Sequence, residues 1–359
     1  MSFMKRILLV LICLIPISVS AQTIEHREEN VRISEVVTEE MNDRGLLDYT
    51  LNVETTYGES FFVDTKESLL GGLSLKLEEG DNILVEIVEE ADGTTAFYKD
   101  IPRVNALYLI GGLFLLITLC VGLLRGLRSI IGLGVTMLIL FWWVFPSILA
   151  GADPVTVTVL GSIVILAVNM HLSHGIKRQT FLAFLSSVAG LGLVLLFTIL
   201  FTGLAHLTGL GTEEETLLFW EISTIKLPVG LLMAGIILGA AGVLDDIAIT
   251  QNEVVEELLR ANPYTDRRTL FKRAMSVGRH HIASTVNTLV LVYAGAALPL
   301  LLLFMHFSGS WQSFLQYEVV AEEIVRTFAG TSALVLTVPI STFFATLQPK
   351  TLDTEKHPT

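Results

Sequence analysis

The chain has 359 residues, of which 52% are apolar and only 16% are charged, and its mean hydropathy is +0.65. An ordinary soluble domain does not tolerate this much apolar surface, so the composition predicts a polytopic membrane protein. The formal net charge of −13 arises in residues 22–104, which hold 20 acidic and 7 basic side chains, and this region has no basic patch that would indicate nucleic-acid binding.

Residues 1–21 have the features of a cleavable signal peptide. Basic side chains precede an apolar run over residues 7–15, and Ala21 ends a set of small residues of the kind that a signal peptidase reads. The alternative is an uncleaved membrane anchor. After cleavage Cys120 is the remaining cysteine, which excludes a disulfide within the mature protomer.

Residues 22–104 are expected to form an exported all-β domain, either barrel-like or a small sandwich, of about five strands. Apolar and polar residues alternate over 31–38, 49–57 and 83–89, and turn-prone Gly and Asp separate these runs. The acidic surface is interpreted as a solubilising surface. Binding of a cation or a cationic partner is the alternative.

Residues 105–347 are expected to form an α-helical polytopic membrane bundle with seven transmembrane helices. Each apolar stretch is long enough, or nearly so, to cross a hydrocarbon core of about 30 Å as a helix. The predicted spans are residues 105–124, 129–149, 154–171, 180–206, 228–250, 283–307 and 328–347.

The distribution of basic residues predicts the orientation. With the N-terminal domain exported, twelve Lys and Arg side chains fall in the cytoplasmic connections and the tail at 348–359, against two in the exported connections. This imbalance agrees with the positive-inside rule and predicts a cytoplasmic carboxyl terminus. We therefore expect a multi-pass protein of the bacterial plasma membrane.

The fifth predicted span carries two adjacent acidic residues, Asp245 and Asp246. At 100° per residue, the stripe that contains Asp246 also contains three glycines, Gly235, Gly239 and Gly242. We predict that this stripe is a tight helix contact that holds Asp246, because a carboxylate at membrane depth needs a partner, a cavity or water. Asp245 is expected to face water. In the alternative reading, both aspartates simply end the span at the interface.

The sixth predicted span offers possible partners for Asp246. A histidine and three hydroxyl side chains cluster on one side of this helix, namely His281, Ser284, Thr285 and Thr288. The hydroxyls and the amide of Asn287 are able to bind a carboxylate or its bound cation. In the alternative reading, the hydroxyls bond to their own helix backbone and Asn287 ties two helices together.

The cytoplasmic connection at 251–282 is predicted to contain two helices. The fifth span continues as NEVVEELLRANP until Asn262 and Pro263 stop it. A second helix is expected to begin at a capping Thr265 and to lie on the membrane surface, with its basic side chains near anionic headgroups. A helix that docks a protein partner would have the same pattern.

Three segments resemble the YibE/F-like family of bacterial multi-pass membrane proteins: GAAGVLDDIAI, NEVVEELLRANP and SVGRHHIASTVNTLVLVYAGAALPLLLLF. The resemblance is expected to cover essentially the whole chain, including the β domain with KLEEGDNILVEI. By position, Asp246 matches the aspartate of the family's glycine-rich span. The residues that match the later motif are Arg279, Asn287, Thr288, Tyr293 and Gly295, and the chain departs from it at His280, where an acidic residue is expected. The resemblance implies an integral membrane protein and no particular activity.

The leading hypothesis is a transporter or channel-like permease that binds a cation, a proton or a small polar solute. The candidate binding residues are Asp246, Asp245, Asn287, Thr288, Ser284 and His281. The alternative is a non-transporting scaffold or assembly factor whose exported domain and basic loop bind other proteins or a second copy of the chain. The chain contains no zinc-binding HExxH pair, GxSG nucleophile or P-loop, so neither an enzyme nor a metal or cofactor is expected. The lipid bilayer is the expected environment, and nucleic acid is not an expected partner.

Overall fold

The computed structural model describes residues 26–43, 45–55, 57–66, 73, 75–90, 93–222 and 228–348. The predicted signal peptide and the predicted tail beyond residue 348 lie outside these residues. The chain divides into two compact units, residues 1–118 and 119–359.

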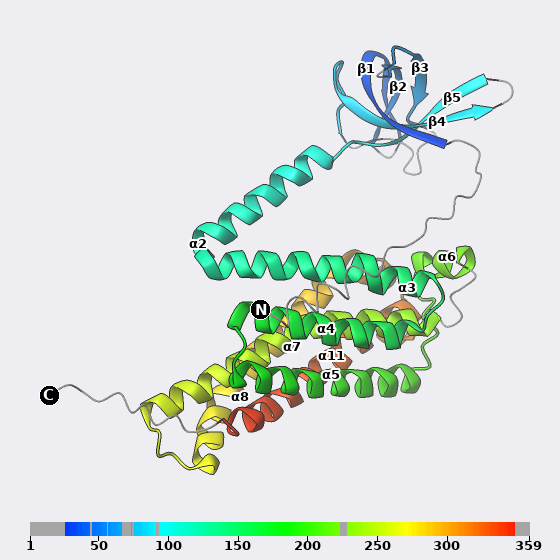
Figure 1. Cartoon of the computed structure of the whole chain (residues 1–359). Coiled ribbons are helices and arrows are strands. Elements are labelled where there is room, and N and C mark those ends of the chain that lie inside the picture. Colours follow the sequence, from blue (N-terminus) through cyan, green and yellow to red (C-terminus); the bar gives the residue numbers. More distant parts are fainter. Residues whose placement is uncertain are drawn as a thin grey trace. The chain divides into compact units, whose positions relative to one another are not determined.

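The N-terminal unit contains a five-stranded antiparallel sheet, which agrees with the predicted all-β domain (Figure 1). Its spatial order is β3-β2-β1-β4-β5, and the strands are β1 (His26–Met41), β2 (Leu47–Glu54), β3 (Ser60–Asp64), β4 (Asn82–Glu90) and β5 (Gly93–Asp100). The pairing of β1 with β2 shifts register after Ile33 and after Val36. Such irregularities bend a strand, and the sheet curls until its edge strands β3 and β5 approach each other.

The inner side of the curled sheet holds an apolar core. Val31 and Ile33 of β1, like Leu51 and Val53 of β2, are at most 1% exposed, while Arg32 between the first pair is exposed. This alternation follows from the two-residue period of a strand, which directs successive side chains to opposite faces. The pattern that predicted the strands therefore also fixes which side of the sheet is buried.

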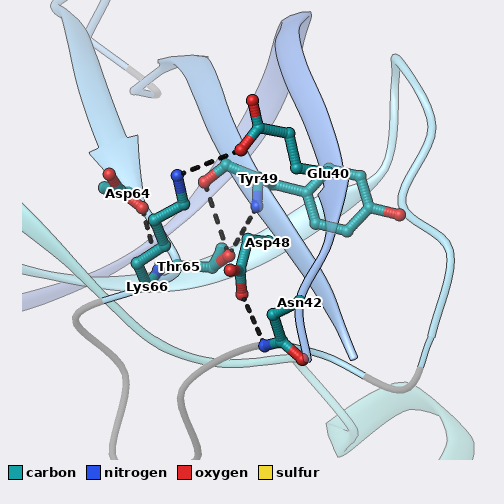
Figure 2. A network of polar contacts seen from close by, with 7 residues as sticks. All are labelled: Glu40, Asn42, Asp48, Tyr49, Asp64, Thr65 and Lys66. Atoms are coloured by element: carbon teal, nitrogen blue, oxygen red, sulfur yellow. Dashed lines mark hydrogen bonds and ion pairs between the residues drawn. The ribbon is translucent and has the colours of Figure 1, made fainter. Parts of the chain in front are cut away.

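A polar network ties the strand ends together where β1, β2 and β3 meet (Figure 2). The Asn42 amide donates to the Asp48 carboxylate at 3.1 Å, and the Tyr49 backbone N–H donates to the Thr65 hydroxyl at 2.8 Å. These hydrogen bonds join the ends of the strands and stabilise this end of the sheet.

The rest of the described chain is helical. The helices are α2 (Val104–Ile139), the π-helix η1 (Leu140–Val144), α3 (Phe145–Leu149), α4 (Pro154–His174), α5 (Arg178–Leu204), α6 (Glu213–Glu221), α7 (Pro228–Ala261), α8 (Arg267–Ala296), α9 (Leu298–Phe307), α10 (Trp311–Gln316) and α11 (Glu318–Ala345).

The helices long and apolar enough to cross a membrane number five in the described part of the chain, or six if α8 and α9 form one broken span. The predicted number is seven. The first two predicted spans form one helical run over residues 104–149, although its backbone leaves helical geometry at Leu123, where φ is +49°. The sixth predicted span is bent by 69° between α8 and α9. The structure thus confirms a set of apolar helices that suits a membrane.

Helices α4, α5, α7 and α11 form the packed core of the second unit (Figure 1). The contact of α5 with α7 and α11 depends on Gly190. A Cβ added there would lie 2.6 Å from Thr337 Oγ1 and 2.6 Å from Leu244 Cδ2. Small residues allow helix backbones to approach closely where lipid provides no hydrophobic drive, so Gly190 marks a close helix contact in this bundle.

The predicted surface helix at 265–279 is wrong in two respects. Its residues belong to α8, which continues without a break to Ala296, and the residue that caps α8 is Asp266, whose carboxylate accepts from the Thr269 N–H at 3.0 Å. Its apolar side chains Leu270 and Ala274 are buried against Val255 and Leu259, in the C-terminal part of α7. The amphipathic pattern was correctly recognised, but a neighbouring helix covers its apolar face.

Candidate functional site

Asp245 and Asp246 of α7 have different surroundings, and these are the reverse of the predicted ones. Asp245 is half-buried and lies in electrostatic range of His174, the last residue of α4. Asp246 is exposed. The prediction that Asp246 is held in the tightest helix contact is therefore wrong within the described protomer. The 100° rotation separates the two carboxylates correctly, but it does not reveal which side of α7 its neighbours cover.

The glycines that share the stripe of Asp246 are also exposed, and the predicted close helix contact is not present there. A Cβ added at Gly242 would meet no atom within 4 Å. The other two glycines lie beneath polar side chains instead of a helix backbone. An added Cβ at Gly235 would lie 3.6 Å from Arg326 Nη1, and one at Gly239 would lie 3.4 Å from the Tyr293 hydroxyl. The side chains of Arg326 and Tyr293 therefore lie over this face of α7.

The register of α7 against α8 follows from two contacts. An added Cβ at Gly239 meets the Tyr293 hydroxyl, and one at Gly278 meets Gln251 Oε1 at 3.1 Å. Because the helices run in opposite directions, Asp246 falls near the level of Ser284. The predicted partners are thus at the right depth along the bundle.

The polar side chains of α8 do not converge on Asp246. Ser284, Asn287 and Thr288 are exposed, and the Thr288 hydroxyl donates to the Ser284 carbonyl at 3.0 Å, as the alternative reading expected. His281 is half-buried, and its Nε2 has no hydrogen-bond partner among the described residues.

A small cavity of about 10 Å³, room for about one water molecule, lies between α7, α8 and α11. Its hydroxyl groups come from Thr285 of α8 and Thr331 of α11, and its other walls are aliphatic, with Ile247 on the α7 side. Thr331 is 8% exposed, and its hydroxyl makes no hydrogen bond to any described group. Thr285 is therefore the predicted polar residue of α8 that lines this cavity.

Buried polar side chains connect α5, α7 and α11 at the opposite end of the bundle from Glu318. The Thr342 hydroxyl donates to Gln251 Oε1 at 3.0 Å, and the Ser341 hydroxyl donates to Ser186 at 3.1 Å. Gln251 is fully buried, and its Nε2 lacks a partner within the described chain. Asn252 is 4% exposed, and the Gln348 amide donates to its side-chain oxygen at 2.9 Å.

At the beginning of α11, Glu318 holds the loop that follows α5. One carboxylate oxygen accepts from the Thr208 backbone N–H, from the Thr208 hydroxyl at 2.7 Å, and from the Gly209 N–H at 3.3 Å. Gly209 has φ of +76° and fits closely against the start of α7 at Pro228 and Val229. The loop is thereby fixed to both helices.

Glu322 lies one turn further along α11 and is 1% exposed. The backbone N–H of Gly211 donates to its carboxylate, and a Cβ added at Gly211 would lie 2.6 Å from Oε2. The other oxygen, Oε1, is buried without a hydrogen-bond partner in the described residues. A carboxylate with one unsatisfied oxygen inside a helix bundle is costly, and such groups mark functional sites in membrane proteins.

An ion pair between Arg326 and Glu323 lies beside Glu322 in α11. Arg326 Nε is 3.3 Å from Glu323 Oε1, within ion-pair distance, although Nε lacks the geometry of a hydrogen bond. Both side chains are about one quarter exposed. Tyr293 of α8 lies in electrostatic range of both charged groups. Because Glu323 already neutralises Arg326 in part, Glu322 has no cation of its own among the described residues.

Sequence analysis missed Glu322 because α11 begins at Glu318, ten residues before the predicted span. The apolar run alone set that boundary, and the acidic residues before it were assigned to an exported connection. The signal was present in EVVAEEIVRTF, where Glu318, Glu322 and Arg326 recur every four residues and therefore share one face of a helix.

Comparison with known proteins gives one family match. The profile of the family described as YibE/F-like protein matches residues 110–351. The match includes the helices and leaves out the β domain, so the resemblance is narrower than the whole chain. Neither the curated proteins nor the solved structures contain a match.

Proposed function

This chain belongs to the YibE/F-like family, and from that premise we propose that it is a permease that moves a small cation or polar solute across a membrane. The proposal assigns the chain no catalytic residue, metal or cofactor. Its path runs between α7, α8 and α11.

We place the protein in the bacterial plasma membrane with seven crossings. The run at 104–149 has 46 residues; as a helix it measures about 69 Å, more than twice a hydrocarbon core of about 30 Å. Its break at Leu123 lies next to Arg125 and Arg128, so two crossings that meet at the cytoplasmic surface account for it. A signal peptide, an exported β domain and a cytoplasmic carboxyl terminus complete this topology.

The observation that carries the proposal is a series of buried polar groups at successive depths along α11, from Glu322 to Thr342. The helical distance between these two residues is about 30 Å, which equals the thickness of the hydrocarbon core. Glu322 and Thr331 lie on opposite sides of the helix, so the groups flank α11 instead of forming one face. Four groups on or beside α11 have buried polar atoms without described partners, namely Glu322, Arg326, Thr331 and Gln251. An unsatisfied buried group costs about 1–3 kcal/mol. A ligand that passes these groups would supply the missing partners, whereas a purely structural bundle has no use for them.

The residues predicted from the sequence form the cytoplasmic mouth in this proposal. Asp245 beside His174 attracts the cation, and Asp246 with the exposed polar side chains of α8 forms the outer rim. The residues of that rim are His281, Ser284, Asn287 and Thr288. The carboxylates raise the local concentration of cations at the entrance.

The test is flux into proteoliposomes with Thr331→Val. This change keeps the shape of the side chain and removes the hydroxyl from the cavity. If one hydrogen bond of about 0.5–1.5 kcal/mol to the passing ligand is lost, flux falls about two- to tenfold. The probes are a proton, a monovalent cation and a small polar solute, each driven by its own gradient.

Thr327→Val is the matched control. Thr327 lies one turn before Thr331 and is equally buried, but its hydroxyl donates to the Glu323 carbonyl of its own helix at 2.8 Å. Its replacement is expected to leave flux within about twofold of wild type. Equal effects of the two substitutions would remove the cavity from the path.

The exposed glycine face of α7 favours a second candidate function, a non-transporting scaffold. Gly242 has open space above it, and the exposed face that it shares with Gly235 and Gly239 has room there for a helix of another protein or of a second copy of the chain. Co-purification after crosslinking distinguishes the two functions. A stable stoichiometric partner together with flux no greater than that of protein-free liposomes would support the scaffold.

A further inference from the structure

Glu322 differs from the other acidic residues at its end of the bundle. Glu318 satisfies the backbone of the Thr208–Gly209 loop, and Glu323 pairs with Arg326. Glu322 is almost completely buried and keeps Oε1 without a partner in the described chain. It is therefore the one of these three carboxyl groups with a vacant acceptor inside the protein.

The groups that face Glu322 leave its charge without full compensation. Glu215 of α6 and Glu318 of α11 bring like charges into electrostatic range, and Arg326 brings the opposite charge. The neighbouring halves of α5 and α7, residues 190–204 and 228–244, contain no titratable side chain. A proton on Oε1 would remove the uncompensated charge and turn a vacant acceptor into a donor.

Gly211 gives this carboxyl group a short route to solvent. Gly211 contacts the Glu322 carboxylate on one side and lines an open hollow in front of α6 on the other. The hollow is also lined by Thr212, Glu213 and Trp220. A single glycine backbone therefore separates the buried acid from a surface that water reaches.

We propose that Glu322 is a proton-binding site, which exchanges its proton past Gly211 with the solvent on the exported side of the membrane. We further propose that the ion moved by the permease is the proton. A hydronium ion transfers its proton to Oε1, an O–H bond forms, and water leaves. The assignment of the proton as the transported ion rests on the proposed function, whereas the proton-binding site at Glu322 does not. A carboxyl group with one vacant oxygen suits a proton, which needs one acceptor, better than a metal ion, which needs several.

Infrared difference spectroscopy of the full-length protein in lipid tests the site without any transport. The wild type is expected to show the C=O stretch of a protonated carboxyl group at neutral pH, and Glu322→Gln is expected to lose this band. Glu323→Gln is the matched control, since it alters the adjacent, partly exposed carboxylate and keeps the band. A spectrum that Glu322→Gln leaves unchanged overturns the site.

Glu322→Asp keeps the test decisive if the glutamine variant does not fold. The shorter side chain moves the carboxyl group away from Gly211, so the pH at which the band titrates should differ from that of the wild type. Identical titration of the two proteins would contradict the assignment.

Proton flux separates the two parts of the proposal. Wild type and Glu323→Gln should acidify proteoliposomes under an imposed pH gradient, and Glu322→Gln should not. Normal acidification by Glu322→Gln overturns the assignment of the proton as the ion that is moved. A band specific to Glu322 without proton flux in any variant would uphold the site and refute proton transport.

Discussion

At the scale of single residues, the functional account depends on which carboxylates are covered. Sequence analysis predicted a polar site at the end of the glycine-rich span, because an apolar helix face does not require a pair of aspartates there. It chose Asp246 over Asp245 because of the neighbouring glycines, whereas α4 covers the Asp245 side. Helical periodicity tells which residues share a face and not which face meets a neighbour.

The two aspartates should therefore differ in their effect on transport. Asp245→Asn removes the half-buried charge beside His174 and is expected to lower flux about two- to tenfold, since it weakens one charged interaction with the cation. Asp246→Asn alters an exposed charge and is expected to stay within about twofold of wild type. Initial rates in proteoliposomes measure both. A larger effect of Asp246→Asn would restore the assignment made from the sequence.

The glycines provide a test of packing at the same scale. Gly190→Ala introduces a Cβ 2.6 Å from two side-chain atoms, so the neighbours must move, and overpacking of this kind costs about 1–3 kcal/mol. Gly242→Ala places its Cβ in open space. The thermal unfolding temperature of the purified protein in detergent should fall for the first variant and remain near that of wild type for the second. Equal losses would show that the glycine face of α7 is also covered, as an interface between copies would require.

At the scale of secondary structure, the elements with strong periodicity were predictable and their ends were not. The β strands follow from alternation, and α7 ends where Asn262 and Pro263 follow Ala261. The beginning of α11 was missed because the charged turn before the apolar run faces inward. The cap of α8 was assigned to Thr265, whose hydroxyl instead donates to the Asn262 carbonyl at 2.9 Å. Thr and Asp are both common capping residues, so the sequence does not show which of two neighbours caps the helix. The hydrogen bond from the Thr269 N–H identifies Asp266.

Asp266 should consequently stabilise the first turn of α8 more than Thr265 does. Asp266→Ala removes the acceptor of the Thr269 N–H and is expected to speed amide hydrogen exchange in the first turn, whereas Thr265→Ala leaves that bond in place. Exchange measured by mass spectrometry compares the two variants. Faster exchange in Thr265→Ala than in Asp266→Ala would contradict the assigned cap.

The same turn should depend on pH. The hydrogen bond from the Thr269 N–H lowers the pKa of Asp266 in the folded protein below its ordinary value. In an unfolded chain the pKa of an aspartate is about 3.9. Its contribution to the helix end is therefore present above that pH and is lost as the pH falls through the folded value. Protection of the first-turn amides should decrease on acidification in the wild type and stay low throughout in Asp266→Ala. Protection that does not change on acidification in the wild type would contradict this linkage.

At the scale of the whole molecule, composition predicted a membrane protein and the described helices agree, since several of them are long, apolar and exposed on their outer surfaces. The interior was not predictable. Serine, threonine and glutamine occur throughout the apolar segments, and only packing shows that some of those on α5, α7 and α11 point inward and bond to one another. These inward polar groups, more than the acidic pair of α7, support a path through the bundle.

Voltage- or gradient-driven flux through the purified wild-type protein is the most direct test of a permease. Proteoliposomes that contain the protein should dissipate an imposed gradient of protons, a monovalent cation or a small polar solute faster than protein-free liposomes of the same lipid, and Thr331→Val should reduce that rate. Dissipation at the rate of protein-free liposomes for every probe would contradict transport by this chain.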